Sequence, residues 1–194
     1  MPEILDEASH LESTTLGVGR TSATVKGGRR FSFGALVVVG DRRGRVGFGY
    51  GKSIEVPNAV EKAQKSAKKQ MLTIARAGST IHHEVEGRFG AAKVRLIPAA
   101  PGTGVVAGGA VRSILELAGV KDCLTKCYGS TNKMNTIRAV FDGLGKLRSP
   151  EQVEQTRGVK LDKTVIQQRI EASTLAMPGR SAVEAHAGES QEQN

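Results

Sequence analysis

Apolar and polar residues alternate through much of the first fifty positions, which is the pattern of β-strands. Residues 15–25 are rich in Thr, Val and Gly, and residues 31–39 place five apolar side chains on one face, namely Phe31, Phe33, Ala35, Val37 and Val39. Residues 45–52 form a third alternating run, and Gly-containing turns at 26–30 and 40–44 separate the three runs. The pattern therefore predicts three consecutive strands, with Phe31 and Phe33 on a core face.

The third run has two different faces. One side carries apolar residues and the other carries only glycines: Val46, Phe48 and Tyr50 against Gly47, Gly49 and Gly51. The apolar face can be buried in a core. The glycine face allows close approach of another backbone or of a sugar-phosphate chain, and the sequence leaves these two alternatives open.

A helix is predicted from Pro57 to Ala77, because Pro57 suits a first helical turn and Gly78 suits the position after the last one. Its inner face carries apolar residues at helical spacing, namely Val60, Ala63, Ala67, Met71 and Ile74. A separate basic stripe, which either contacts RNA or is simply solvated, consists of Lys62, Lys65, Lys69 and Arg76, with Lys68 beside it. Three strands and one helix predict a compact domain at residues 12–78, after a flexible leader at residues 1–11.

A second unit of strands and helices is predicted at residues 79–148. Residues 93–98 and 120–128 have strand patterns, and a Gly-rich loop at 102–109 leads into a helix at 110–118. Asn132 or Asn135 can cap a further helix whose buried positions are Ile137, Val140, Phe141 and Leu144. The fold class is therefore α+β, with two small cores that we expect to be independent.

Residues 149–176 are predicted to form a helical extension. Ser149 and Gln152 have the spacing of a capping box, with Pro150 at the first helical position, and a second helix is expected from Asp162 to about Ala172. Residues 177–194 are rich in Ser, Glu, Ala, Gly and Gln, a composition that cannot bury a core. We expect this tail to be disordered.

The charge of the body indicates a polyanionic partner. Residues 20–178 contain 27 basic and 12 acidic side chains, a net charge of +15, within a chain of net charge +9. No apolar run approaches the ~20 residues that a membrane span requires, and the acidic start does not resemble a signal peptide. Cys123 and Cys127 are best explained as reduced thiols of a cytosolic protein. We therefore expect a cytoplasmic protein that binds nucleic acid.

The segment from Lys26 to Arg30 is the strongest candidate for RNA contact. Its two glycines keep the backbone slim, and its three cations can reach phosphates that a flat sheet cannot; the alternative is an ordinary solvated hairpin tip. Because Phe31 and Phe33 alternate as a core face would, we expect recognition by shape and phosphate contact and not by base stacking. The predicted RNA-binding residues are Arg20, Lys26, Gly27, Gly28, Arg29, Arg30, Arg42, Arg43, Arg45 and Lys52.

Enzymatic alternatives are weak. The segment Gly47–Ser53 resembles a phosphate-binding loop, but Val46 stands where that motif requires glycine. Gly102, Gly104 and Ala107, with Asp122 further on, fit a relaxed dinucleotide-binding pattern, although Ala99–Pro101 separates this loop from the preceding strand. The adjacent His82 and His83 would face opposite sides of a strand and could not share a metal. We predict no catalytic residue, no metal and no cofactor.

Several segments read together resemble a known family. They are Val25–Arg29, Phe31–Phe33, Val38–Asp41, Gly44–Lys52, Glu55–Pro57, Gly102–Gly104, Ala107–Ala110, Tyr128–Asn132 and Ser149–Glu151. In this order they are similar to the bacterial form of the small-subunit ribosomal protein number five family, over about residues 11–160. Residues 160–194 extend beyond that family's usual end.

The resemblance implies an N-terminal domain similar to double-stranded-RNA-binding folds. It also implies a two-layer C-terminal α/β domain with a left-handed βαβ crossover, against the usual handedness. The implied function is that of a structural constituent of the small ribosomal subunit. Such a protein binds small-subunit rRNA, contacts small-subunit proteins four and eight, and supports translational accuracy and the channel through which mRNA enters. Family members meet protein four at positions that correspond to Gly102, Thr103, Gly104 and Arg112, and we expect no homo-oligomer.

Overall fold

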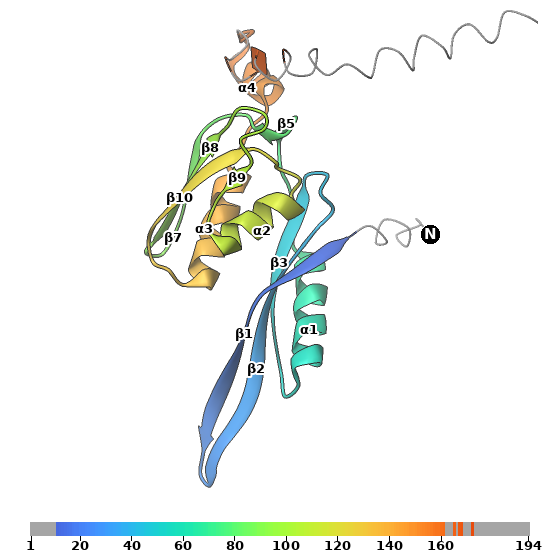
Figure 1. Cartoon of the computed structure of the whole chain (residues 1–194), viewed down its shortest axis with the longest axis vertical. Helices are drawn as coiled ribbons and strands as arrows, with labels where there is room; N and C mark the ends of the chain where they lie inside the picture. Colours follow the sequence, from blue (N-terminus) through green and yellow to red (C-terminus); the bar gives the residue numbers. More distant parts are fainter. Residues whose placement is uncertain (1–10, 162–164, 166, 169–171, 173–194) are drawn as a thin grey trace, which may run out of the picture.

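The computed structural model describes residues 11–161, 165, 167, 168 and 172. In chain order its elements are β1 (Glu12–Val25), β2 (Gly28–Gly40), β3 (Arg45–Ser53), α1 (Val56–Lys69), β4 (Met71–Thr73), β5 (Arg76–Ala77), β6 (Thr80–Ile81), β7 (Val85–Phe89), β8 (Ala92–Pro98), β9 (Val105–Val106), α2 (Gly109–Leu117), β10 (Cys123–Gly129), α3 (Lys133–Gly145) and α4 (Pro150–Arg157). Helices and mostly antiparallel strands occur together, which is the α+β class that the sequence predicts (Figure 1).

The N-terminal sheet is antiparallel, with the strand order β1-β2-β3-β4. The three predicted strands are present, and β4 is a fourth that the sequence analysis missed. It exists because α1 ends at Lys69, eight residues before the predicted end at Ala77. The next residue, Gln70, leaves the helical conformation, and Met71 then pairs with Gly47 at the edge of β3.

The predicted helix end is therefore wrong, and so is the place of three residues on it. Met71 lies in β4, Ile74 follows that strand, and Arg76 lies in β5. Ile74 still reaches the core, and Leu72 packs against it, so the segment buries apolar surface without helical structure. Gly78, with a φ of 60°, belongs to the turn between β5 and β6. The basic stripe of α1 accordingly contains lysines but not Arg76.

Helix α1 covers the glycine face of β3. A Cβ atom added to Gly47, Gly49 or Gly51 would lie 2.1–2.5 Å from a carbonyl oxygen of α1. Such distances are far inside van der Waals contact, so the helix backbone occupies this face directly. Of the two alternatives that the sequence leaves open, the structure shows a packed backbone and leaves no room for a sugar-phosphate chain.

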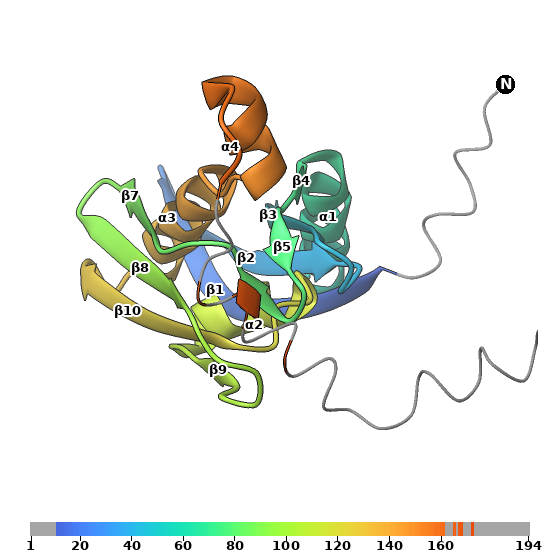
Figure 2. The same ribbon diagram turned by 90° about the horizontal axis from the view of Figure 1, so that it is seen from above.

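The C-terminal sheet has the order β7-β8-β10-β9, and α2 and α3 lie between it and the N-terminal sheet (Figure 2). Strands β9 and β10 are parallel, so β9, α2 and β10 form a βαβ unit. Two features that the resemblance implies stay predictions. One is the left-handedness of this crossover, and the other is the similarity of the first domain to double-stranded-RNA-binding folds. The layers run from the second sheet through α2 and α3 to the first sheet and then α1.

Helix caps follow the sequence closely. The Asn132 side chain accepts a hydrogen bond from the Met134 amide at 3.1 Å and begins α3. Ser149 and Gln152 form the predicted capping box of α4. Residues 1–10 of the predicted leader, most of the helix expected from Asp162, and the tail at 177–194 lie outside the described residues.

The two sheets share one core, so the expected independence of the two units is wrong. Leu36, Val38 and Val46 from the first sheet belong to the same buried cluster as Leu96 and Ile114. The reason is that β2 is buried on both faces: every residue from position 34 to position 40 is buried. Alternation identifies one apolar face of β2 against α1, but it does not identify the second face against α2 and α3.

Candidate nucleic-acid interface

The first two strands project beyond the rest of the molecule. Strand β3 ends with Ser53 opposite Phe33, while β1 and β2 continue as a two-stranded hairpin to the pair Val25 and Gly28. Five residues of strand correspond to roughly 17 Å. Within this part the Thr21 hydroxyl donates a hydrogen bond to the Ser32 carbonyl at 3.2 Å. The hairpin is the lowest part of Figure 1.

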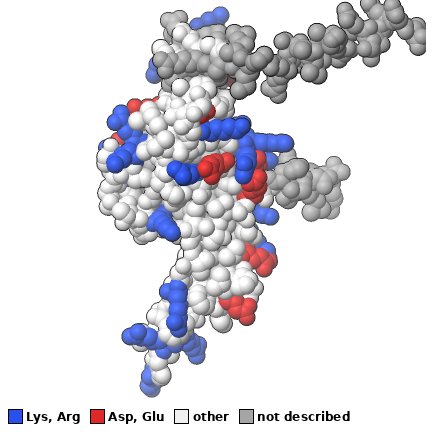
Figure 3. All heavy atoms as spheres, viewed as in Figure 1, with Lys and Arg blue, Asp and Glu red and all other residues white. Residues whose placement is uncertain are grey.

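Exposed cations gather on this projection. Lys26 lies in the two-residue turn, and Arg29 and Arg30 follow it on opposite faces of β2. Figure 3 shows basic side chains at the tip with no acidic side chain beside them on this face. With Arg20 and Lys52 nearer the base of the hairpin, they form a group of five exposed cations that we call the hairpin patch: Arg20, Lys26, Arg29, Arg30 and Lys52.

An aromatic ring on the hairpin departs from the expectation. Phe31 is 46% exposed, and the guanidinium carbon of Arg20 lies 3.6 Å from its ring centroid. Phe31 was predicted to face the core, and that prediction is wrong, because the ring lies past the end of β3 where α1 does not reach. Alternation alone cannot show where the covering elements stop. Phe31 is thus a candidate functional residue that the sequence analysis missed.

The remaining predicted cations lie at the opposite end of the sheet: Arg42 and Arg43 in the turn between β2 and β3, and Arg45 at the start of β3. Arg42 pairs with Glu12 at 2.7 Å, and Arg45 pairs with Asp41 at 2.8 Å. Partial burial acts to raise the pKa of Asp41, but hydrogen bonds from Arg45 and the Arg43 amide outweigh it and the pKa is lowered. Much of the positive charge here is therefore compensated. The predicted set is divided into the hairpin patch and this turn.

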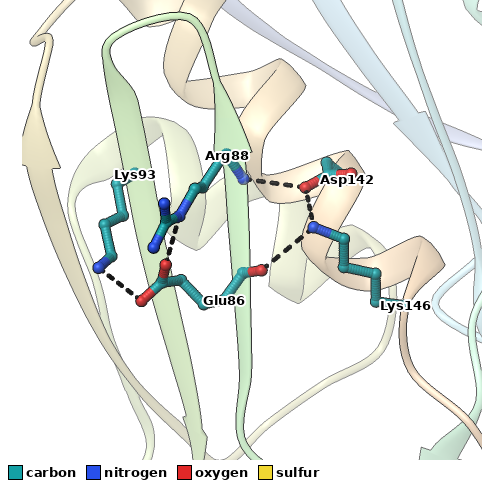
Figure 4. Close-up of polar contacts among 5 residues, drawn as sticks. All are labelled: Glu86, Arg88, Lys93, Asp142 and Lys146. Carbon is teal, nitrogen blue, oxygen red and sulfur yellow. Dashed lines mark hydrogen bonds and ion pairs between the residues drawn. The ribbon is translucent and has the colours of Figure 1, made fainter.

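Charge on the C-terminal sheet is also compensated. Glu86 accepts a hydrogen bond from Arg88 at 2.6 Å and pairs with Lys93 at 2.7 Å, as Figure 4 shows. Asp142 accepts from the Arg88 amide at 2.9 Å and from Lys146 at 2.5 Å. These contacts hold the pKa of both carboxylates below the usual range. The hairpin patch differs because no ion pair to an acidic residue occurs within it among the described residues.

The loop predicted to meet a protein partner is held by hydrogen bonds that involve side chains as well as by its glycine backbone. Gly102 and Gly104 have φ values of 85° and 79°, which favour glycine. The Thr103 hydroxyl donates to the Ala100 carbonyl at 2.7 Å, and the Gly104 amide donates to the Asp122 carboxylate at 3.0 Å. Asp122 is buried and engaged with this loop, so it is not placed to bind a ribose. The dinucleotide-binding alternative therefore lacks the acidic residue that would bind the ribose.

A groove of about 850 Å³ is lined both by a predicted RNA-binding residue and by a predicted protein-contact residue. Arg42, expected to bind RNA, and Arg112, expected to meet a protein, line it with Arg76, Glu116 and Lys121. Arg76 is fixed there by a hydrogen bond to the Gly119 carbonyl at 3.0 Å. The sequence analysis missed Arg76 because it placed that residue on a helix.

Chemistry other than binding finds little support in the described part of the chain. No group of three His, Cys, Asp or Glu residues there could hold a metal ion. Both cysteines are free, and burial raises the pKa of the Cys123 thiol to about 11. The segment Gly47–Ser53 is strand β3 and not a phosphate-binding loop. None of the described helices is long and apolar enough to span a bilayer.

Comparison with known proteins identifies the family of this chain. Residues 11–75 match the model of the ribosomal protein S5 N-terminal domain, and residues 87–157 match that of the ribosomal protein S5 C-terminal domain. The chain belongs to the ribosomal protein S5 family. It is 53% identical over 156 residues to small ribosomal subunit protein uS5 of Vibrio cholerae, which covers 80% of this chain and 93% of that protein.

Other relatives in the S5 family are similar to the same extent. The uS5 protein of Aliivibrio fischeri is 51% identical over 156 residues, covering 80% of this chain and 94% of the relative. That of Cereibacter sphaeroides is 52% identical over 157 residues, covering 80% and 84%. Members of the family are structural ribosomal proteins, so the predictions of a cytoplasmic small-subunit protein that is not an enzyme are confirmed.

Proposed function

We propose that this chain binds small-subunit rRNA through the hairpin patch. The observation that carries the proposal is the gathering of five exposed cations on one narrow projection: among the described residues none of the five forms an ion pair with an acid, whereas Arg42, Arg45 and Arg88 each do. Cations left close together on a narrow projection repel one another, and RNA phosphates remove that repulsion. Each phosphate contact also releases condensed counterions, which favours binding at low salt.

A salt series tests this role. Replacing Lys26, Arg29 and Arg30 together with Ala should weaken binding to small-subunit rRNA and flatten the slope of log affinity against log salt by about two to three. The control removes three exposed cations from α1 instead, at Lys62, Lys68 and Lys69. The control should change the slope less. Equal slopes for wild type and the hairpin variant would remove the patch from the interface.

We further propose the neighbours that the family resemblance implies. The exposed loop at 102–104, together with Arg112, would meet small-subunit protein four, and protein eight would be a second neighbour. The hydrogen bonds that fix the loop, one of them to Asp122, support this role, because a rigid loop loses little entropy when a partner docks. Contact at this surface would influence translational accuracy and the channel through which mRNA enters.

Two measurements test the placement in the subunit. A tagged copy should sediment with small subunits in cell lysate, whereas a free protein would remain at the top of the gradient. Arg112→Ala should raise misreading of a reporter more than it lowers the amount of assembled subunits, because a weakened contact shifts a conformational equilibrium. Lys126→Ala, another exposed cation, is the control. Loss of subunits with unchanged misreading would contradict the accuracy role.

A further inference from the structure

The stack of Arg20 on Phe31 is a π-surface that the hairpin presents to solvent. The guanidinium carbon lies 3.6 Å from the ring centroid, close to van der Waals contact, so the group rests against the ring. Phe31 is 46% exposed, and Arg20 is exposed as well. Within residues 11–161 no further strand pairs with this part of the hairpin, because β3 ends opposite Phe33. The pair is therefore open to a planar ligand.

The surroundings of the stack fit a nucleotide. Cross-strand pairing places Ser22 opposite Phe31 and Thr24 opposite Arg29, so these four residues and Arg20 lie on one face of the hairpin. Aromatic rings and guanidinium planes are the surfaces on which unpaired RNA bases stack. A neighbouring cation and hydroxyl groups are suited to the phosphate and the sugar. One face thus contains a group for each part of a nucleotide.

We propose that Arg20 and Phe31 form a stacking site for one unpaired RNA base, with Arg29 holding the adjacent phosphate. The inference rests on the proposed rRNA binding and adds base recognition to it. A base within a duplex has both faces covered by its neighbours, so the ligand is a bulged, looped or single-stranded nucleotide. The flat Arg20 guanidinium stacks on Phe31 with one face and offers the other to the base.

The test uses the full chain and an RNA stem that carries a single bulged 2-aminopurine, compared with the same stem fully paired. Stacking quenches the fluorescence of this base, so wild type should quench the bulged probe and bind it more tightly than the paired stem. Arg20→Lys keeps the charge but loses the plane, and Phe31→Leu keeps the apolar volume but loses the ring. Each should reduce the preference for the bulged probe by about 5- to 150-fold, the range expected for one stacked base.

Matched variants separate stacking from charge and from folding. Arg138→Lys is the matched control, because this exposed arginine lies 4.9 Å from the ring centroid of Phe89, outside the hairpin patch; it should behave as wild type, and Phe31→Tyr should keep the preference. Equal preferences for Arg20→Lys and Arg138→Lys would overturn the stacking site. So would a wild type that binds small-subunit rRNA but does not distinguish the two probes. Failure of wild type to bind small-subunit rRNA at all would instead overturn the proposed function.

Discussion

The rings of Phe48 and Phe141 meet with their centroids 4.7 Å apart and their planes inclined at 56°. This tilted contact joins β3 of the first sheet to α3, which packs under the second sheet. Aromatic pairs in such geometry contribute beyond the area that they bury. The contact shows in one pair of side chains why we expect the two units to unfold together: they share a core.

Phe48→Ala is therefore expected to destabilise both units together. The loss should be about 3 kcal/mol, the lower end of the range for Phe→Ala, because Phe48 is only half-buried. Denaturant unfolding followed by amide signals from β2 and from β8 should give one shared, lowered midpoint. Ile54→Ala, at a side chain that is 78% exposed, is the control and should change little. Separate midpoints for the two strands would contradict the shared core.

The glycine face of β3 leads to a second prediction. A Cβ at position 49 would lie 2.1 Å from the Ala63 carbonyl oxygen, so Gly49→Val must push α1 away from the sheet. We expect a loss of stability of about 3 kcal/mol or more, because backbone and not a flexible side chain must move. Gly19→Ala in β1, where an added Cβ meets nothing within 4 Å, is the control. Thermal unfolding of the two variants measures the difference.

Asp41 makes stability depend on pH in a defined direction. Its pKa is lowered in the folded chain from the ordinary value of 3.8, so its charged form stabilises the fold above that pH. The contribution is lost as the pH falls through the lowered folded pKa. Asp41→Asn should cost about 1–2 kcal/mol near neutral pH, and the difference from wild type should shrink as the pH falls below 3.8.

The exposed pair of Glu12 and Arg42 provides the comparison for Asp41. More than half of each side chain's surface is exposed, so Glu12→Gln should cost less than about 0.5 kcal/mol at any pH. Urea unfolding of wild type and of both variants between neutral and acidic pH measures how each loss of stability depends on pH. A loss at position 41 that stays constant with pH would show that its carboxylate charge has no role.

Local chemistry made much of this fold predictable. Asn132 and the Ser149 capping box begin helices where the sequence places them, because caps depend on residues a few positions apart. The end of α1 could not be found this way. Met71 and Ile74 continue a helical spacing, yet pairing with β3 and burial against the second unit favour an extended chain there. Tertiary contacts overrode a local pattern.

The candidate site was predictable in its charge but not in its shape. The cluster of Lys26, Arg29 and Arg30 is visible in the sequence, and so are its glycines. That Arg42 and Arg45 would lie at the other end of the sheet, paired with acids, depends on strand register and on Glu12. The exposure of Phe31 depends on where β3 stops. Alternation of apolar and polar residues shows that one face of a strand is apolar, but it does not show which element covers that face.

Gly28 gives the last prediction, which separates the shape of the hairpin tip from its charge. Its φ of 148° lies in a region that L side chains rarely adopt, although an added Cβ would meet nothing within 4 Å. Gly28→Ala should therefore strain the turn by about 1–3 kcal/mol and speed amide exchange at its cross-strand partner Val25. Binding to small-subunit rRNA should weaken because Arg29 and Arg30 lose their fixed positions.

The salt dependence identifies the cause of that weakening. Gly28→Ala removes no cation, so its slope of log affinity against log salt should stay closer to that of wild type than the slope of the Lys26, Arg29 and Arg30 triple variant. Gly19→Ala is the matched control, because Gly19 also meets open space but has no positive φ of this kind. It should bind as wild type does. If both glycine variants bind equally well, the backbone conformation at Gly28 does not position the cations, and their charge alone accounts for binding.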